Sequence, residues 1–521
     1  MNYSQIEVKD NFITIIKKLL NLDLFSKLLF AITFLIIVSV NVIYSKNPIL
    51  DQYGFRQTQT ALTSYYLNQN GFSLSYETPV IGKPWSIPFE FPIYQQIVAS
   101  TSKFFSSPLT QTGRLVSLLF LILSCFPIFF TLSKLKVDEK SIYFSLALFL
   151  SSPIYIFWSG TFMIESAALF FALTFLYFAV NLIQRNWSPV NFVLFATFLL
   201  LASLQKITTV LPIFLLVGII IIFVSIILED FRLRLPRLFG LLVTIVLPLL
   251  IAYIWIKYTD LVKAENPIGL KLTSKALSSW NYGTIDLRLS KQFWIDVIFN
   301  RNIKAASFYG LGVVAVCITY LLSKDKLLKN ILLGSSLLFL VPFLIFSNLH
   351  SIHTYYQIAN SVFLSIAVGI SVCFLCNRYL GQRAGIYGLV LLAFIFSNYL
   401  FFYKTYYHDK STVINVENNK VLKLSDFIKT HTHFNKPVIW YGFDWSSEAA
   451  FYSERKSLTV PDWESFVIDS IKTPDIFLGK DIPSAVVLCP MAKYDIVKIE
   501  ITKKYPLAKV HRVEDCEIFL L

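Results

Sequence analysis

The stretch LLFAITFLIIVSVNVIYS (residues 28–45), followed at once by KNPILDQYGFRQ (residues 46–57), decides the fold class of this chain. Its apolar part is close to the roughly 20 residues that a helix needs to cross a bilayer. Asp51 and Arg56 follow where such a helix would leave the membrane. Comparable apolar runs occur at residues 114–131, 141–158, 162–180, 189–204, 209–228, 238–258, 305–322, 330–347, 359–376 and 386–402. We therefore predict a multi-span α-helical membrane protein with about eleven transmembrane helices.

The composition agrees with a membrane protein. The 521 residues are 55% hydrophobic and 15% charged, whereas soluble domains average about 45–50% apolar and about 25% charged residues. The 48 Phe and 27 Tyr suit the aromatic belts of membrane interfaces. The net charge of +14 comes from short loops beside apolar runs. Because these residues form no soluble basic face, nucleic acid is not expected as a partner.

The basic residues also predict the orientation. With the N-terminus inside, every inner segment between the runs carries Lys or Arg, as cytoplasmic loops do. These residues are Lys9, Lys17, Lys18, Lys27, Lys134, Lys136, Lys140, Arg185, Arg232, Arg234, Arg237, Lys324, Lys326, Lys329, Arg378 and Arg383. Residues 1–27 contain no cleavage site, so the first run is expected to be an uncleaved signal anchor. The expected location is the inner (plasma) membrane, with a cytoplasmic N-terminus.

Three long segments then fall on the outer side. Residues 1–402 form the expected transmembrane domain, with outer loops near 46–113 and 259–304. The first loop has apolar stripes near 61–69 and 93–105, which predict two amphipathic helices lying in the membrane interface. Residues 403–521 mix strand-like runs (437–441, 484–489, 516–521) with a helix-like run (421–430), which predicts a soluble, extracytoplasmic α/β domain. In an oxidising compartment, Cys489 and Cys516 could pair there.

Two carboxylates on the outer side are candidates for chemistry. Asp51 could act as a general base beside Arg56, or it could simply cap a helix. Glu90, in PWSIPFEFPIYQQ, lies between prolines and aromatic residues. Partial burial there would perturb its pKa, although it could equally be an ordinary interfacial glutamate.

Cations on the same side could bind a phosphate. Lys206, in LASLQKITTV, could contact one or simply extend to the interface. Arg288, in WNYGTIDLRLS, could bind a phosphate through two N–H groups of its planar guanidinium. Glu165, in FMIESAALFF, starts a predicted span on this face and could be a helix cap.

The segment HSIHTYYQ (residues 350–357) is the most distinctive local pattern. His350 and His353 could bind a metal from one helix face, but no third ligand follows at regular spacing. Tyr355 and Tyr356 could belong to an aromatic belt or to a site. A divalent metal is thus possible but unsupported. There is also no Walker loop, dinucleotide fingerprint or serine nucleophile elbow, so a soluble nucleotide donor is unsupported.

Over residues 28–402 the chain resembles the GT-C membrane glycosyltransferases, in the branch of the protein O-mannosyltransferases and lipid A aminoarabinose transferases. The resemblance rests on Asp51 with Arg56 and Gln57, and on FEFPIYQQ, FMIES, LQKITT, WNYGTIDLRLS and HSIHTYYQ, in this order and on one face. It implies that Asp51 is the catalytic base and Glu90 a second acid of the site. Family members often have a lysine directly after that acid, where this chain has Phe91. Phosphate binding would then fall to Arg56, Lys206, Arg288, Tyr355 and Tyr356.

The implied reaction is an inverting transfer of a sugar from a polyprenyl-phosphate donor to an acceptor hydroxyl on the outer face. No cofactor is required for it, and the acceptor could be a glycan, a lipid or a protein. A membrane ligase or polymerase of glycan chains is an alternative. A secondary transporter fits less well, because the charges gather at one interface and not at mid-span.

Overall fold

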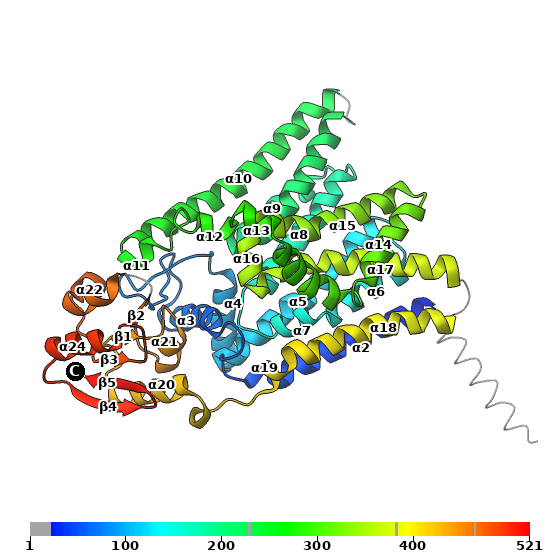
Figure 1. Ribbon diagram of the computed structural model, residues 1–521. Coiled ribbons are helices and arrows are strands. Elements are labelled where there is room, and N and C mark those ends of the chain that lie inside the picture. The colour runs from blue at the N-terminus through cyan, green and yellow to red at the C-terminus, as the bar shows by residue number, and fades with distance from the viewer. Residues whose placement is uncertain (1–21, 228–230, 381–383, 463–464) are drawn as a thin grey trace, which may run out of the picture.

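The computed structural model describes residues 22–227, 231–380, 384–462 and 465–521. Long helices lie side by side, and a small sheet with its own short helices is placed at one end of them (Figure 1). Residues 1–21 precede the expected signal anchor and lie outside the described residues, as do Lys9, Lys17, Lys18 and Arg383 of the predicted inner segments.

The long helices account for most of the predicted apolar runs. They are α2 (Leu22–Ile43), α5 (Leu109–Lys134), α6 (Glu139–Ser151) with α7 (Pro153–Trp158), α8 (Glu165–Ile183), α9 (Pro189–Ile227), α10 (Phe231–Ala264), α14 (Leu311–Leu322), α15 (Lys326–Ile345), α17 (Ile358–Leu380) and α18 (Ala384–Phe402). Within the described ranges, eight helices are long and apolar enough to cross a membrane. The protein is therefore mostly helical and multi-span.

Three runs differ from simple spanning helices. Residues 141–158 are divided between α6 and α7, because Pro153 cannot donate the backbone hydrogen bond that would continue α6. The run at 305–322 contributes only the short α14. The runs at 189–204 and 209–228 share α9, in which Lys206 has extended backbone angles (φ −166°, ψ 96°). The helix is thus interrupted at Lys206.

The first outer loop contains η1 (Tyr44–Lys46), α3 (Gly54–Asn70) and α4 (Ile93–Phe105). Both predicted helices exist, but α3 does not lie on a surface, since residues 57–64 are all buried. It packs between α5 and the C-terminal part of the chain. Gly54 permits this approach, because a Cβ there would lie 2.3 Å from Glu448 Oε1. The amphipathic interpretation of this segment was therefore wrong.

The second outer loop and the segment before α17 consist of short elements. They are α11 (Pro267–Leu270), α12 (Ser278–Tyr282), α13 (Ile285–Leu289), the π-helix η2 (Phe293–Lys304), α16 (Ser347–Ile352) and η3 (Thr354–Gln357). The α12 segment lies against α16, as Asn348 Nδ2 donates to Trp280 O at 2.8 Å.

The C-terminal part forms a mixed sheet with strand order β2-β1-β3-β5-β4. The strands are β1 (Val438–Tyr441), β2 (Ser457–Val460), β3 (Ala485–Leu488), β4 (Lys509–Val513) and β5 (Cys516–Leu520). The helical elements between and before them are η4 (Tyr403–Tyr407), α19 (His408–Ser411), η5 (Val416–Asn418), α20 (Lys420–His431), α21 (Glu448–Ser453), α22 (Phe466–Lys472), α23 (Asp475–Leu478) and α24 (Tyr494–Lys504). Strands β1, β2 and β3 are parallel, and β5 and β4 add antiparallel.

Helices cover both faces of this sheet, which is why β1 is apolar throughout. Val438 and Trp440 face α20 and α21, whereas Ile439 and Tyr441 share the core of α22 and α24. A disulfide joins Cys489 to Cys516 and ties β3 to β5.

The first outer loop continues the sheet at its β2 edge. Ser457 N donates to Pro79 O at 3.1 Å and Thr459 N donates to Val80 O at 2.7 Å. Val80 and Trp85 lie in the same apolar core as β2 and α22. Through these contacts the C-terminal sheet is held against the loop that also carries Glu90.

Candidate active site

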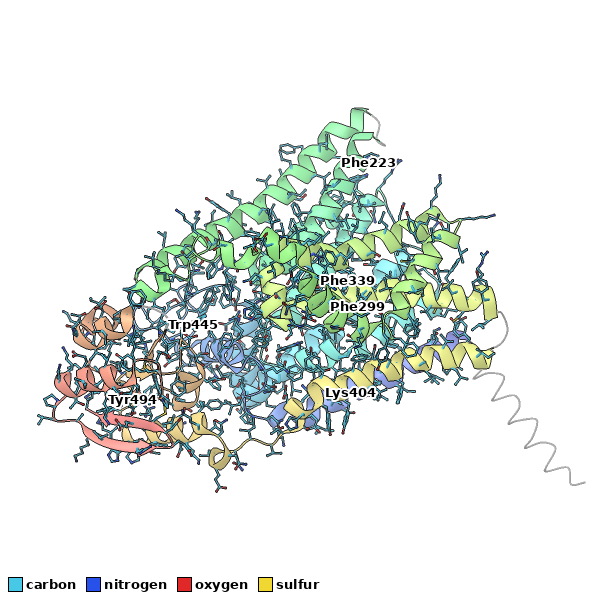
Figure 2. All side chains as sticks on the ribbon, viewed as in Figure 1. Phe223, Phe299, Phe339, Lys404, Trp445 and Tyr494 are labelled. Carbon is cyan, nitrogen blue, oxygen red and sulfur yellow. A yellow bond between two sulfur atoms is a disulfide. The ribbon has the colours of Figure 1, made fainter. Side chains whose placement is uncertain are left out.

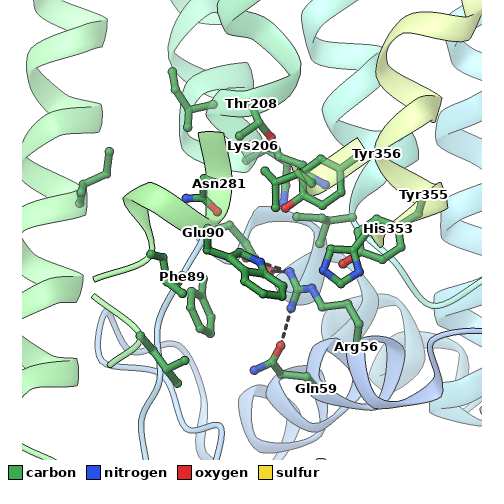
Figure 3. A pocket seen from close by; sticks show the side chains of 18 of the residues that line it. Arg56, Gln59, Phe89, Glu90, Lys206, Thr208, Asn281, His353, Tyr355 and Tyr356 are labelled. Atoms are coloured by element: carbon green, nitrogen blue, oxygen red, sulfur yellow. Dashed lines mark hydrogen bonds and ion pairs between the residues drawn. The ribbon is translucent and has the colours of Figure 1, made fainter. Parts of the chain in front are cut away.

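A cavity of about 840 Å³ lies where the outer loops meet the helices and the C-terminal sheet. Its walls come from α3, the Phe89–Glu90 segment, the interruption of α9, α10, α12, α16, η3 and the loop after β1. Arg56, Glu90, Lys206, His353 and Tyr356 surround one common space (Figure 3). The structure therefore brings predicted site residues from four distant segments together in one cavity.

Glu90 supplies a carboxylate that is 9% exposed. Both of its oxygens lie 3.1 Å from Arg56 NH2, and Gln95 Nε2 donates to Oε1 at 2.8 Å. Arg56 NH1 also donates to Gln59 Oε1 at 2.8 Å. Among the described donors Oε2 accepts only from Arg56, so it can accept a further proton or hydrogen bond from the cavity side.

The backbone around Glu90 is fixed on three sides. Tyr76 OH donates to Glu90 O at 2.8 Å and accepts from Phe89 N at 3.0 Å. Trp255 Nε1 on α10 donates to Phe89 O at 3.1 Å. Phe91 N donates to Leu204 O on α9 at 2.9 Å. Phe91, directly after Glu90, is therefore used for a helix contact, with its ring packed on Trp255.

Lys206 occupies the interruption of α9. Its Nζ lies 2.7 Å from Glu165 Oε1 and 3.8 Å from the centre of the Tyr356 ring. The lysine side chain is 10% exposed and that of Glu165 is 4% exposed. Interrupted membrane helices leave backbone and side-chain polar groups for a ligand. Glu165 thus holds Lys206 at the cavity wall; it is buried and paired, not a simple helix cap.

Further polar atoms of the cavity wall have no hydrogen-bond partner within the described part of the chain, three of them beside the interruption of α9 and one on His353. Ser203 Oγ, Gln205 Nε2, Thr208 Oγ1 and His353 Nδ1 lack hydrogen bonds among the described residues, and all four side chains line the cavity. Gln205 is fully buried, and its Oε1 already accepts from Tyr94 N at 3.1 Å. Unpaired buried polar atoms are costly, so these four atoms are available to bind a polar ligand or water in the cavity.

The HSIHTYYQ segment contributes aromatic side chains. The rings of His353 and Tyr355 stack with their centres 5.2 Å apart, and the rings of Tyr355 and Tyr356 stack with their centres 5.1 Å apart. Burial, with smaller effects of Lys206 and Arg56, lowers the pKa of His353 to about 4. His350 packs on Phe343 and is not among the lining residues. In the described part of the chain, no group of three or more His, Cys, Asp or Glu side chains is arranged to hold a metal.

Asp51 has a different environment. Arg114 NH1 lies 2.9 Å from its Oδ2, and Gln57 Nε2 donates to its Oδ1 at 2.7 Å. Arg114, 2% exposed, also donates to Gly160 O and Pro48 O. Gln57 accepts from Phe162 N. Asp51 thus lies in a buried network that joins the end of α2, α3, α5 and the segment before α8.

Arg288 is also engaged with the protein. Its Nε donates to Leu344 O at 2.7 Å, and NH2 donates to Tyr282 O at 2.7 Å. Asp51 and Arg288 are absent from the described residues that line the cavity, whereas Glu90, Arg56, Lys206, Tyr355 and Tyr356 are present.

Sequence reasoning missed several lining residues. Gln59, Trp280, Asp444 and Trp445 line the cavity, the last two from the loop after β1. Figure 2 shows Trp445 between the sheet and the helices. No local pattern could have placed this loop near α3. Arg114 was detectable, because an arginine at the start of an apolar run requires a partner.

No protein-family model and no curated protein sequence matches the chain. Solved structures do. The aminoarabinose transferase ArnT from Cupriavidus metallidurans, bound to undecaprenyl phosphate, aligns with a TM-score of 0.63 and 12% identity over 94% of this chain and 97% of its own.

Two further structures align. The oligosaccharyltransferase AglB from Archaeoglobus fulgidus, in complex with an inhibitory peptide and a dolichol-phosphate, has a TM-score of 0.53 and 12% identity over 92% of this chain and 72% of its own. The arabinofuranosyltransferase AftD from Mycobacteria has a TM-score of 0.54 and 11% identity over 94% of this chain and 39% of its own. All three are GT-C glycosyltransferases, and the fold of this chain is the GT-C fold.

Proposed function

We propose that this protein is an inverting glycosyltransferase that moves a sugar from a polyprenyl-phosphate donor to an acceptor hydroxyl at the outer face of the membrane. The observation that carries the proposal is the cavity itself: a fixed carboxylate, Glu90, shares it with Lys206 and with unpaired polar groups on an interrupted helix. A GT-C fold surrounds it.

Glu90 is assigned as the general base. Its carboxylate accepts the proton of the acceptor hydroxyl while the hydroxyl oxygen bonds to the anomeric carbon of the donor sugar. The bond between that carbon and the phosphate oxygen breaks in the same step, and polyprenyl phosphate leaves. One displacement inverts the anomeric configuration.

Asp51, which the resemblance suggested as the base, is assigned a positioning role. Its two oxygens already accept from Arg114 and Gln57, and it does not line the cavity among the described residues. Gln57 lies directly after Arg56 on α3, so Asp51 holds the part of the helix that presents Arg56 to Glu90.

Lys206 is assigned to the donor phosphate, with the hydroxyl of Tyr356 and the neighbouring Arg56 as further donors. A charged donor in a buried site stabilises the negative charge that grows on the leaving phosphate. Tyr355 supports Tyr356 by stacking, and His353 lines the same wall. Arg288 is not required for this role, because its guanidinium is bound to backbone carbonyls.

The apolar wall of the cavity suits the lipid part of the donor. Leu204 and Ile207 on α9 line it together with Ala252 and Ile256 on α10. The outer surface of α10 exposes large apolar side chains such as Leu250 and Ile254, as a helix in contact with lipid does. A polyprenyl chain can therefore reach the cavity from the bilayer.

The topology proposed for this function has eleven crossings. Lys206 would separate two crossings within α9, and α6 with α7 would form another. The positive-inside rule supports a location of the cavity and of residues 403–521 on the outer side. The Cys489–Cys516 disulfide is consistent with an oxidising compartment.

No metal is needed in principle, since the phosphate already activates the sugar. A glycan, a lipid or a protein remains possible as acceptor, and a ligase or polymerase of pre-assembled glycans is the alternative function. Purified protein in nanodiscs, incubated with a panel of polyprenyl-phosphate sugars, tests the proposal. Release of polyprenyl phosphate from at least one donor, lost in Glu90→Gln, is expected; consumption of none of them would count against it.

A further inference from the structure

The cavity has an exposed end as well as a buried one. Lys271, Trp280 and Asp444 are exposed, whereas the side chains of Glu90 and Lys206 are 9% and 10% exposed. All five line the same cavity. A molecule that enters from water therefore passes the exposed end, here called the mouth, before it reaches Glu90.

One wall of the mouth is Trp445, and it is anchored to α3. Ser447 Oγ donates to Phe55 O at 2.6 Å and lies 2.8 Å from Thr58 Oγ1. The ring centres of Trp445 and Phe55 lie 6.4 Å apart. Because Phe55 directly precedes Arg56, the C-terminal sheet presents this indole at a fixed place relative to the reaction centre.

Trp280 also lines the mouth, and it is 48% exposed. Its backbone is held by Asn348 Nδ2 at 2.8 Å, and the nearby Tyr282 O accepts from Ser347 Oγ and from Arg288. These contacts hold the half-exposed indole of Trp280 at the cavity, where it can pack against a bound molecule. This also gives Arg288 a role: it positions the α12 segment.

We propose that the mouth is the acceptor subsite and that it binds a sugar ring of a glycan acceptor; this rests on the proposed function. The C–H groups on the face of a pyranose are weakly positive and pack against the negative face of an indole. The carboxylate of Asp444 and the amide of Asn281 offer hydrogen-bonding groups for ring hydroxyls.

Other acceptors fit this mouth less well. A polyprenyl acceptor would need a continuous apolar lining, but the mouth carries Lys271, Asn281 and Asp444. An extended peptide commonly adds to a sheet edge. The β2 edge is already paired with Pro79 and Val80.

The test measures the binding of sugars to the full chain in nanodiscs by saturation-transfer NMR. The probes are methyl pyranosides and trisaccharides with a blocked reducing end. At least one probe is expected to bind, and Trp445→Leu and Trp280→Ala should each weaken its binding about tenfold. Trp445→Leu retains an apolar contact with Phe55. Trp187→Phe, a tryptophan between α8 and α9 that does not line the cavity, is the control and should bind as wild type.

Unchanged sugar affinity in both cavity variants, or binding of no probe, would overturn the inference. So would displacement of the bound sugar by short peptides but not by other sugars. A parallel titration with undecaprenyl phosphate separates the two proposals. Suppose that the lipid binds, that Lys206→Ala weakens its binding, and that the tryptophan variants keep their sugar affinity. This result refutes the acceptor subsite but not the proposed donor site. Failure of the lipid to bind refutes the proposed donor, whereas the sugar titration still decides the subsite.

Discussion

Replacing Glu90 by glutamine removes the proposed base with a minimal change of shape. The variant keeps one oxygen, which can still accept from Gln95, but its amide nitrogen would face the NH2 donor of Arg56. Loss of a general base costs about 10²–10⁴ in rate. Loss of a charge-assisted hydrogen bond to Arg56 costs about 1.5–3 kcal/mol of stability.

The assay measures release of polyprenyl phosphate under saturating donor, together with the melting temperature. We expect kcat to fall at least about 100-fold in Glu90→Gln, while a folded protein remains. Glu90→Asp keeps the charge and should retain more activity than Glu90→Gln. Glu77→Gln is the matched control, because Glu77 lies in the same loop as Glu90 and forms an ion pair with Lys456, but it does not line the cavity. Wild-type turnover in folded Glu90→Gln would refute the assignment of the base.

Further predictions concern the donor, the buried network and pH. Lys206→Ala should weaken undecaprenyl phosphate binding by one to two decades, about 1.5–3 kcal/mol, whereas Arg288→Ala should leave that affinity unchanged in a lipid titration. Asp51→Asn should lower stability by about 3 kcal/mol because it breaks a buried ion pair, yet turnover per folded molecule should stay within about tenfold of wild type; full stability with lost turnover would instead make Asp51 the base. The pKa of His353 is about 4 in the fold and about 6.5 in an unfolded chain, so below pH 6.5 the unfolded state binds more protons and stability is lost as pH falls from about 6.5 to about 4. From pH 7.5 to pH 5 the melting temperature of wild type should fall by more than that of His353→Gln, because the variant lacks this loss; equal falls would contradict the prediction.

Local patterns of the sequence were sufficient for much of the fold. Run length predicted most long helices, and the strand-like runs at 437–441, 484–489 and 516–521 coincide with β1, β3 and β5. The apolar runs placed Lys206 between two spans, but they could not reveal that Pro189–Ile227 form one helix interrupted at Lys206, or that Lys206 pairs with Glu165. Nor could they reveal that α3 would be buried by the C-terminal sheet.

Local sequence patterns also predicted part of the candidate site. Glu90 and the tyrosines of η3 were visible as polar or aromatic residues in unusual local contexts. The environment of Asp51 was not, since Arg114 is 63 residues away in the chain. The partners of Arg288 are backbone carbonyls, which no residue pattern records. Trp445 lies about 390 residues after α3 in the chain, so only the folded structure shows that its loop contacts this helix.

A structure of the full chain with bound undecaprenyl phosphate would test the central claim most directly. The account predicts that the phosphate lies in the cavity against Lys206 Nζ and the Tyr356 hydroxyl, with the lipid chain between α9 and α10 and with Glu90 facing the position of the transferred sugar. A phosphate bound instead beside Asp51 and Arg114, or outside the cavity, would contradict it.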